Sequence, residues 1–452
     1  MSIHLLSRRG FCRLGLGTCG LSLLPPAFAA LQPGDERTAW YRDAKFGMFI
    51  HWGPYAQASV EASWPVMVPK AGGITEAKYT ALPWTFNPRH YDPNAWIDLA
   101  RTSGQQYMVF TTKHHDGFCM FDSAYTDYKI TKTPYGKDIV KQLADACDAR
   151  DMRLGFYYSP PDMHHPDFRD TSKPISENWH GQPERPVWPM YLQYMQLQLT
   201  ELLTRYGPAC LVWFDGLNDQ KKYDGQRVLD LIHHLQPATL VNDRIGVPGD
   251  YVTPEQFIPS AIPTRGAHFN AVDQSVNKQL KPGVPSPEDF QLWETCMTIN
   301  NTWAYNAKDH DYKSSRMLIR SLVEVVSRGG NFLLNVGPSP DGIIQPEFEQ
   351  RLRAIGNWMR VYSDSIYGTQ YGPIQGVDTL RSTAKRDTVF LHVFDWPART
   401  LTITPLQRKV QSVSLMANGM PLAFRQTHAA IEIDVPAKAP DDDVSVLAMR
   451  LL

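Results

Sequence analysis

Short apolar runs that end in polar side chains recur along the first three quarters of this chain, and amphipathic helical stretches separate them. The clearest run extends from Cys210 to Gly216 and reads Cys-Leu-Val-Trp-Phe-Asp-Gly, so that the carboxylate of Asp215 closes a continuous apolar stretch. Such a run is typical of a strand buried on both faces of a parallel sheet. The other apolar runs are residues 46–52, 107–113, 154–159, 239–244, 291–295 and 331–336. The helical stretches are residues 94–103, 137–150, 190–206, 226–235, 314–328 and 345–362. This alternation predicts an α/β fold, and a (β/α)8-type barrel rather than an open sheet.

The pattern changes at about residue 371. From there to the C-terminus, short β-type runs are broken by Pro, Gly and Asn, and no helical period appears. These runs are residues 388–394, 400–404, 412–415, 430–435 and 444–451. We therefore expect a catalytic (β/α)8-like barrel over residues 30–370 and an antiparallel β-sandwich accessory domain over residues 371–452.

The first 29 residues have the features of an export signal. Residues 7–13, Ser-Arg-Arg-Gly-Phe-Cys-Arg, resemble a twin-arginine motif, residues 14–24 are mildly apolar, and Ala-Phe-Ala at residues 27–29 resembles a cleavage site. The apolar stretch is shorter than the ~20 residues that a membrane-spanning helix needs, and no later segment qualifies. We expect residues 1–29 to be a twin-arginine signal peptide, and the mature protein to be periplasmic or secreted, without a membrane partner.

Charge and cysteine content exclude several classes of partner. The 45 Lys and Arg residues balance 46 Asp and Glu residues, so the chain has no basic surface of the kind that binds nucleic acid. Beyond the predicted signal, the cysteines form neither a Cys-x-x-Cys pair nor a Cys/His spacing suited to zinc. These cysteines are Cys119, Cys147, Cys210 and Cys296. Because Cys210 and Cys296 lie in predicted strands, we expect these two to be buried free thiols, with a disulfide as the open alternative, and neither a metal nor a cofactor.

Ionisable side chains follow the predicted strands at the points where those strands end. They are His51 after the first run, His114 and His115 after the second, Asp215 in the fourth and Arg244 in the fifth. In a (β/α)8 barrel the active site forms at the C-terminal ends of the strands. A purely structural barrel has no need of imidazoles, a carboxylate and a guanidinium at successive strand ends. The sequence therefore predicts an enzyme.

The three histidines are interpreted as hydrogen-bond partners for sugar hydroxyls, and the alternatives are a metal site or polar core packing. If the second strand continues, His114 and His115 point to opposite faces of the sheet and cannot easily bind one ion. His51 is followed by Trp52 and Gly53 rather than by the second histidine of a His-x-His metal motif. Both points argue against a metal-dependent hydrolase.

A glycosidase of the common kind needs two carboxyl groups, one as nucleophile or base and one as acid. Asp215 is the predicted nucleophile, because the indole and the glycine that flank it suit the floor of a pocket. The second carboxyl is either Glu255, in the long predicted loop of residues 248–290, or Glu294 on the sixth run. Glu255 is favoured because a loop carboxyl under a partly apolar lid gains the raised pKa that a general acid needs. Glu294 could instead form an ion pair with Arg244 and hold that side chain in place.

Tryptophans also lie beside the predicted strand ends, and they have two interpretations. They fill the core, or they form flat platforms on which the apolar faces of sugars stack. The tryptophans in question are Trp52, Trp64, Trp213, Trp293 and Trp303. Their position next to polar strand ends favours the second interpretation.

Several segments of the predicted barrel carry a specific set of motifs. They are Phe-Gly-Met-Phe-Ile-His-Trp-Gly at residues 46–53, Lys-His-His-Asp-Gly-Phe at 113–118, Trp-Phe-Asp-Gly at 213–216, Asn-Asp-Arg at 242–244, Trp-Glu-Thr-Cys at 293–296, and the segments 331–338, 341–342 and 366–369. Together these segments resemble glycoside hydrolase family 29, the α-L-fucosidases. The resemblance extends from Trp40 to Thr369, which is essentially the whole predicted barrel.

The resemblance implies a retaining exo-α-L-fucosidase that removes terminal fucose from oligosaccharides or glycoconjugates through a covalent fucosyl-enzyme. Asp215 would be the nucleophile, and Arg244 would lie near the acid. The side chains that would hold the fucose hydroxyls are His51, His114, His115 and Tyr158. The C5 methyl group of fucose should meet a small apolar patch, for which Phe49 and Trp303 are the candidates.

The chain departs from the family pattern in two places. Ser63-Trp64 stands where many members have Glu-Trp, which puts one hydroxyl contact in question, and Ala304 follows Trp303 where Gly is usual. Two other functions stay open, namely a glycan-binding protein on an inactive barrel and a metal-dependent hydrolase. The intact carboxyl candidates and histidines argue against the inactive barrel.

Overall fold

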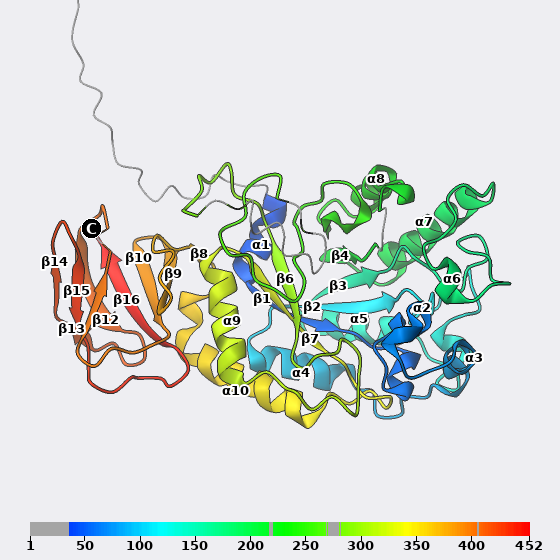
Figure 1. Cartoon of the computed structure of the whole chain (residues 1–452), viewed down its shortest axis with the longest axis horizontal. Helices are drawn as coiled ribbons and strands as arrows, with labels where there is room; N and C mark the ends of the chain where they lie inside the picture. The colour runs from blue at the N-terminus through cyan, green and yellow to red at the C-terminus, as the bar shows by residue number, and fades with distance from the viewer. Residues whose placement is uncertain (1–35, 217–219, 268, 270–279, 281, 405) are drawn as a thin grey trace, which may run out of the picture.

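The computed structural model describes residues 36–216, 220–267, 269, 280, 282–404 and 406–452. The predicted signal peptide, residues 1–29, lies outside these described residues. Figure 1 shows two parts, a barrel of parallel strands surrounded by helices and a group of antiparallel strands at one end of the molecule. Helices α9 (Ser315–Ser327) and α10 (Pro346–Tyr362) lie between the two parts.

Seven parallel strands form one curved sheet in the order β5-β4-β3-β2-β1-β7-β6. Their bounds are β1 Phe46–Ile50, β2 Tyr107–Lys113, β3 Arg153–Tyr158, β4 Leu211–Phe214, β5 Leu240–Val241, β6 Glu294–Thr298 and β7 Asn331–Val336. Each strand overlaps one of the seven apolar runs predicted from the sequence. The strands are buried along almost their whole length, because helices cover the outer face of the sheet and side chains fill its interior.

The sheet closes through residues 251–256, which the sequence placed in a loop. Parallel bridges join this segment to the end of β5 and to β6, pairing Asn242 with Tyr251, Val252 with Trp293 and Glu255 with Cys296. The segment therefore occupies the eighth position, and the (β/α)8-type barrel is confirmed. No apolar run predicted it, because it is short and contains Pro254, which has no N–H to donate to a ladder. Glu255 lies within the predicted loop between β5 and β6, and its bridge to Cys296 holds it against the barrel wall.

Six long helices match the six helical stretches predicted from the sequence, and no helix end differs from the prediction by more than two residues. Besides α9 and α10 they are α4 Pro93–Ser103, α5 Ile139–Ala149, α7 Trp188–Arg205 and α8 Gly225–Leu235. Ser314 caps α9 as expected, because its hydroxyl oxygen accepts the amide of Met317 at 3.1 Å. Shorter helices precede β1 or lie in the loops: α1 Glu36–Ala44, α2 Trp64–Met67, α3 Glu76–Ala81 and α6 Ile175–Asn178.

The C-terminal strands form a six-stranded and a three-stranded antiparallel sheet with an apolar core of their own. The larger sheet has the order β13-β12-β16-β10-β9-β8, and the smaller one has the order β11-β15-β14. The bounds are β8 Gln370–Tyr371, β9 Leu380–Lys385, β10 Thr388–Val393, β11 Thr400–Ile403, β12 Val410–Leu415, β13 Pro421–Leu422, β14 Phe424–Gln426, β15 Ile431–Asp434 and β16 Ser445–Leu451. The predicted antiparallel sandwich is confirmed, and the strands that the sequence did not indicate are short or, like β9, rich in polar residues.

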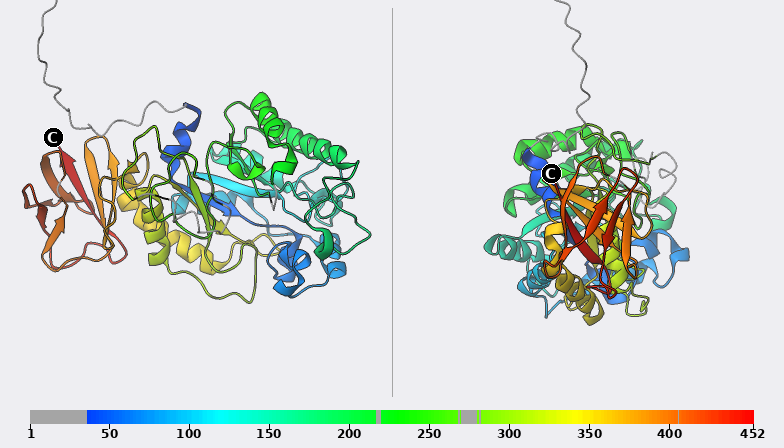
Figure 2. Two further views of the ribbon diagram at one scale, coloured as in Figure 1. Left: turned by 45° about the horizontal axis from the view of Figure 1, so that its top comes forward. Right: turned by 90° about the vertical axis from the view of Figure 1, so that its left-hand side faces the viewer.

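The antiparallel strands lie beside α9 and α10, as the left-hand view in Figure 2 shows. The indole N–H of Trp358 on α10 donates to the carbonyl oxygen of Val444 at 2.9 Å. Glu324 on α9 binds the guanidinium of Arg381 on β9, with Nε donating to Oε2 at 2.7 Å. The side chain of Phe390 joins the apolar core of the barrel. Apolar and charged contacts together therefore fix the C-terminal part on the barrel.

The four cysteines of the described residues are all free. Cys296 is buried as expected, whereas Cys210, just before β4, is only partly buried. None of the helices in the described ranges is both long and apolar enough to cross a membrane.

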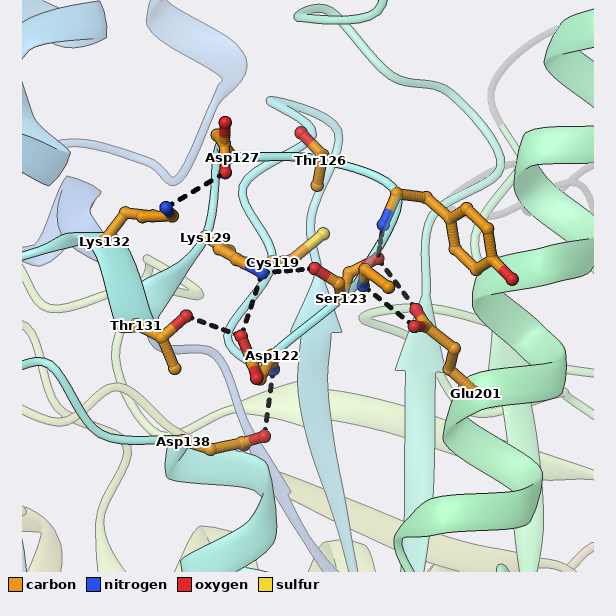
Figure 3. Close-up of polar contacts among 12 residues, drawn as sticks. Cys119, Asp122, Ser123, Thr126, Asp127, Lys129, Thr131, Lys132, Asp138 and Glu201 are labelled. Atoms are coloured by element: carbon orange, nitrogen blue, oxygen red, sulfur yellow. Dashed lines mark hydrogen bonds and ion pairs between the residues drawn. The ribbon is translucent and has the colours of Figure 1, made fainter.

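A polar network ties the loop between β2 and α5 to neighbouring helices (Figure 3). Ser123 Oγ donates to Oε2 of Glu201 on α7 at 2.8 Å, and the Lys129 ammonium lies 2.9 Å from Asp122 Oδ1. The amide of Asp122 donates to Oδ2 of Asp138, which precedes α5, at 2.9 Å. These contacts fix the segment that follows the two adjacent histidines, and so they hold the end of β2 in place.

Candidate active site

The three predicted histidines lie together at the C-terminal end of the barrel. Strand β2 ends at Lys113, so His114 and His115 lie in a turn, with ring centres 4.2 Å apart. The ring of His51, which follows β1, is centred 5.8 Å from that of His114. The expectation that His114 and His115 point to opposite faces is wrong, because the strand does not continue through them. The three imidazoles instead border one space, which we call the cup.

Each imidazole of the cup is held through its Nδ1 atom. The partners are Asn335 Oδ1 for His51 at 2.7 Å, Ser63 Oγ for His114 at 2.8 Å and Ser159 Oγ for His115 at 2.6 Å. Burial lowers the pKa of His51 and of His115 to about 4, and it lowers the pKa of His114 well below its usual value. At neutral pH the cup is therefore lined by uncharged imidazoles, whose Nε2 atoms suit hydrogen bonds with hydroxyls.

Asp215, directly after β4, is held at both carboxylate oxygens. Nη1 of Arg244 donates to Oδ1 at 2.8 Å, and the hydroxyl of Tyr157 donates to Oδ2 at 3.0 Å. Nε2 of His115 lies 3.5 Å from Oδ2, which is too long for a strong hydrogen bond. Burial raises the pKa of Asp215, but Arg244 and the hydrogen bonds lower it more, so the pKa lies below its usual value. Asp215 is therefore an anion at neutral pH, and its side chain is 19% exposed, which leaves it within reach of a ligand.

Glu255 is bound by the same arginine nitrogen as Asp215. Nη1 of Arg244 donates to Oε2 of Glu255 at 2.9 Å. Thr253 fixes the rest of the guanidinium, because its Oγ1 accepts Nε at 2.8 Å and its carbonyl oxygen accepts Nη2 at 3.0 Å. Burial raises the pKa of Glu255 and the charge of Asp215 raises it further, and together they outweigh Arg244. Two neighbouring carboxyls thus have pKa shifts in opposite directions, as a nucleophile and an acid require.

Glu294, the other predicted acid, lies in the interior of the barrel below the cup. Its side chain is fully buried and accepts hydrogen bonds from the Trp213 indole, at 3.0 Å, and from the Tyr107 hydroxyl. Burial raises the pKa of Glu294 to about 7. Its hydrogen bonds come from these neutral donors, whereas Arg244 forms its ion pairs with Asp215 and Glu255. The alternative that Glu294 forms an ion pair with Arg244 is therefore wrong.

Tyr158, which the sequence assigned to the cup, points away from it. Its hydroxyl donates to Gln198 Oε1 on α7 at 2.8 Å, and the Lys113 ammonium lies 4.4 Å from the ring centre. Tyr157 points inward instead and reaches Asp215. The register of β3 and β4 explains this direction, because Tyr157 pairs with Trp213, which has the same inward phase as Asp215.

The tryptophans divide between the core and the cup. Trp52, Trp213 and Trp293 are buried, and the ring of Trp213 lies in the barrel interior with the Arg244 guanidinium carbon 4.6 Å from the ring centre. Trp64 lies with its ring centre 5.9 Å from that of His115, and Trp303 with its ring centre 5.0 Å from that of His51. Both are partly exposed. Phe49, the other candidate for an apolar patch, is buried, with its ring centre 6.0 Å from that of Trp303.

One further carboxyl near the cup, that of Glu61, was not identified from the sequence. Both oxygens of Glu61 accept the backbone amide of Trp303, at 2.9 and 3.1 Å. Burial raises the pKa of Glu61 to about 7, and the charge of Glu255 contributes to this shift. No sequence pattern identifies Glu61, because its position depends on the loop before α2. Ser63, the departure from the family pattern, is buried and forms the hydrogen bond to His114.

Two carboxyls with opposed pKa shifts, an arginine between them and uncharged imidazoles around them, at this end of a (β/α)8-type barrel, define a glycoside hydrolase. The α-L-fucosidase family model matches residues 27–364, which is most of the chain. The chain therefore belongs to the α-L-fucosidase family. In the described part of the chain, no three His, Cys, Asp or Glu side chains form a group that could hold a metal ion.

Similar proteins agree with this assignment. Plasma alpha-L-fucosidase of Homo sapiens is 30% identical over 414 residues, which cover 85% of this chain and 82% of the human one. Alpha-L-fucosidase isoenzyme 1 from Paenibacillus thiaminolyticus is 33% identical with a TM-score of 0.81, over 92% of this chain and 99% of that one. A trapped covalent intermediate of a family 29 alpha-L-fucosidase from Bacteroides thetaiotaomicron is 26% identical with a TM-score of 0.77, over 92% of this chain and 96% of that one.

Proposed function

We propose that this protein is a retaining exo-α-L-fucosidase that releases terminal fucose through a covalent fucosyl-enzyme on Asp215, with Glu255 as acid and base. The observation that carries this proposal is the sharing of Arg244 Nη1 by Asp215 Oδ1 and Glu255 Oε2. Both oxygens lie within 3 Å of one nitrogen, so they are at most about 6 Å apart. Retaining glycosidases place their carboxyls about 5–5.5 Å apart, whereas inverting enzymes leave about 6.5–9.5 Å for a water molecule.

The roles of the carboxyls follow from their environments. Asp215 is the more acidic of the two and attacks the anomeric carbon, while Glu255 gives its proton to the departing glycosidic oxygen. In the second step Glu255 takes a proton from water, the water oxygen attacks the anomeric carbon, and the bond to Asp215 breaks. Two inversions give α-fucose as the first product. Glu294 is a weaker candidate for the acid, because it is fully buried below the cup.

The uncharged imidazoles supply the binding contacts of the proposal. Nε2 of His115 is buried and has no hydrogen bond, although it points toward Asp215. An unpaired buried nitrogen beside the nucleophile is satisfied when a sugar hydroxyl binds there. His51 and His114 offer their Nε2 atoms to further hydroxyls, and Trp303 beside His51 offers an apolar surface to the C5 methyl group.

Structures of similar proteins support the same chemistry. The Bacteroides thetaiotaomicron neighbour is a covalent intermediate with 2-fluoro-fucosyl fluoride, trapped in a mutant in which glutamine replaces a glutamate. For this chain we infer that a carboxylate forms a covalent bond to the sugar and that a glutamate assists the hydrolysis of that bond. Fucosylated oligosaccharides or glycoconjugates are the corresponding substrate class.

Proton NMR of an aryl α-L-fucoside during the first minutes of hydrolysis tests the mechanism. Retention predicts that α-fucose accumulates first and that β-fucose then appears at the rate of spontaneous mutarotation, measured separately on free fucose. If β-fucose appears first, the covalent mechanism is excluded. No release of fucose from any α-L-fucoside would favour a glycan-binding role.

We further propose that the protein is exported by the twin-arginine route and acts in the periplasm or outside the cell. The twin-arginine motif over residues 7–13 and the cleavage-type site at residues 27–29 carry this proposal. Replacing both Arg8 and Arg9 by Lys should leave the activity in the cytoplasmic fraction of a bacterial host, whereas the unchanged chain should reach the periplasm. If the variant and the unchanged chain show the same division of activity between cytoplasm and periplasm, the proposal is excluded.

A further inference from the structure

Glu294 forms part of a polar network inside the barrel, directly below the cup. Its Oε1 atom accepts the indole N–H of Trp213 at 3.0 Å, and its Oε2 atom accepts the hydroxyl of Tyr107. Gly47 leaves space for this network, because a Cβ atom at that position would lie 2.5 Å from Cζ of Tyr107. A fully buried carboxyl is costly unless it is well hydrogen-bonded. Its presence where apolar side chains would fill the barrel calls for a function.

The indole that Glu294 binds contacts both groups that hold the proposed nucleophile. The guanidinium carbon of Arg244 lies 4.6 Å from the centre of the Trp213 ring, within the range of a cation–π contact. The ring of Tyr157 is stacked on the Trp213 ring, with centres 5.8 Å apart and planes at 17°. Arg244 and Tyr157 are the donors to the two oxygens of Asp215. The Trp213 ring therefore packs against both Arg244 and Tyr157, the two residues that donate hydrogen bonds to Asp215.

We infer that Glu294 is a positioning residue of the fucosidase reaction, which acts by fixing the Trp213 indole beneath Arg244 and Tyr157. The hydrogen bond from the indole N–H to Glu294 helps to set the orientation of the Trp213 ring within its packed surroundings. Rotation of that ring would displace the guanidinium that joins Asp215 to Glu255, and misplacement of a reacting group by about 1 Å costs roughly 100-fold in rate. This inference rests on the proposed roles of Asp215 and Glu255. Glu294 itself touches neither substrate nor the reacting atoms.

Two substitutions at Glu294 separate hydrogen bonding from charge and packing. Glu294→Gln keeps an acceptor for the indole N–H, and Glu294→Leu removes it at similar volume. We expect the leucine variant to lose kcat by roughly 10- to 100-fold with KM changed by less than about threefold, and the glutamine variant to keep most of its kcat. We also expect the acidic limb of the pH profile to move to higher pH in the leucine variant, because a displaced Arg244 lowers the pKa of Asp215 less.

Trp213→Phe provides the second half of the test, because phenylalanine keeps an aromatic ring and lacks the indole N–H. This variant should reproduce the loss in kcat, and the Trp213→Phe/Glu294→Leu double variant should lose little more, since both changes remove the same hydrogen bond. Glu324→Leu, far from the cup at the contact with β9, is the control for destabilisation. It should lower the melting temperature and leave kcat unchanged.

The inference is overturned if Glu294→Leu keeps the kcat of the unchanged enzyme, if glutamine and leucine at this position are equally inactive, or if the losses of the double variant are additive. If the leucine variant fails to fold, Trp213→Phe decides alone, and an unchanged kcat in that variant overturns the inference. An inactive Asp215→Gly variant beside fully active Glu294 and Trp213 variants removes this inference and leaves the proposed function intact. A fully active Asp215→Gly variant removes the proposed function itself.

Discussion

The hydroxyl of Tyr157 donates a 3.0 Å hydrogen bond to Oδ2 of Asp215. Because Arg244 binds the other oxygen, the carboxylate cannot rotate without losing a donor. The orientation of the proposed nucleophile is therefore set by a residue one position away from the tyrosine that the sequence indicated.

Replacement by phenylalanine should affect activity at Tyr157 and stability at the adjacent Tyr158. Tyr157→Phe removes a hydrogen bond to an anion, so kcat/KM should fall roughly 10- to 100-fold, and the acidic limb of the pH profile should move to higher pH because that bond lowers the pKa of Asp215. Tyr158→Phe leaves Gln198 without its donor, so it should cost about 1–2 kcal/mol of stability with kcat within about twofold. Steady-state kinetics and thermal unfolding of both variants check this. Equal kinetic effects would contradict the assignment.

Removal of the Asp215 carboxylate should abolish turnover and leave a space for a small anion. We expect Asp215→Gly to lose roughly 1,000-fold or more in kcat on an aryl α-L-fucoside. Added azide should enter the vacated space, attack the anomeric carbon and form β-fucosyl azide, which NMR identifies. Near-normal turnover without azide would remove Asp215 from the mechanism.

Replacement of the proposed acid and base should depend on the leaving group. Glu255→Gln should slow the hydrolysis of substrates with poor leaving groups, whereas a dinitrophenyl fucoside should still react in the first step because it needs little protonation. Azide should then accelerate the second step and give α-fucosyl azide, the opposite anomer from that of the Asp215→Gly variant. Glu294→Gln is the matched control and should show no azide effect. Azide acceleration in Glu294→Gln but not in Glu255→Gln would reverse the assignment.

The pH dependence of kcat/KM should depend on Arg244, because the charge of its guanidinium lowers the pKa of both carboxyls that it binds. The proposed mechanism requires Asp215 ionised and Glu255 protonated, so kcat/KM should rise as Asp215 loses its proton and fall as Glu255 loses its own. Arg244→Met raises both pKa values, and we expect both limbs to move to higher pH along with a lower maximum. The pair titrates as a unit, so the limbs report the two carboxyls jointly. Limbs that stay fixed would show that Arg244 does not control these carboxyls.

The sequence predicted the features that depend on continuous local patterns. Buried parallel strands are apolar along their length, and the polar residue at each end is visible, so Asp215, Arg244 and the histidines were placed at the correct strand ends. The direction of a side chain is a different matter. The end of β2 turns before His114, and which of Tyr157 and Tyr158 faces inward depends on the phase of β3 relative to β4.

Features that depend on distant contacts were not predictable in this way. The eighth position of the barrel is occupied by a segment with a proline, and its place is set by pairing with β5 and β6 rather than by its own pattern. Glu61 reaches the cup only because the loop before α2 brings it to the amide of Trp303, 242 residues further along the chain. The burial of Glu294 likewise results from Tyr107 and Trp213, which other strands supply.

The contact between the barrel and the C-terminal strands should contribute stability that depends on pH. Glu324 on α9 binds Arg381 on β9, with Nη2 lying 2.5 Å from Oε1, and it also binds Arg328. Burial raises the pKa of Glu324, but its hydrogen bonds to Arg381 and the charge of Arg328 lower it more, so the folded-state pKa lies below the unfolded one. This stabilisation is therefore complete above the unfolded pKa of about 4.3 and is lost as the pH falls through the folded pKa.

We expect Glu324→Gln to lower the free energy of unfolding by about 2 kcal/mol at pH 7, with kcat unchanged, because the charged pair is only partly exposed and lies far from the cup. The deficit should shrink as the pH falls below about 4, where the unchanged chain loses the same interaction. Glu349→Gln, which breaks an exposed pair with Arg353 on α10, should change stability by less than about 0.5 kcal/mol. Thermal unfolding of the three proteins at several pH values measures these differences. A deficit that persists unchanged in acid would mean that packing rather than charge fixes the C-terminal strands on α9.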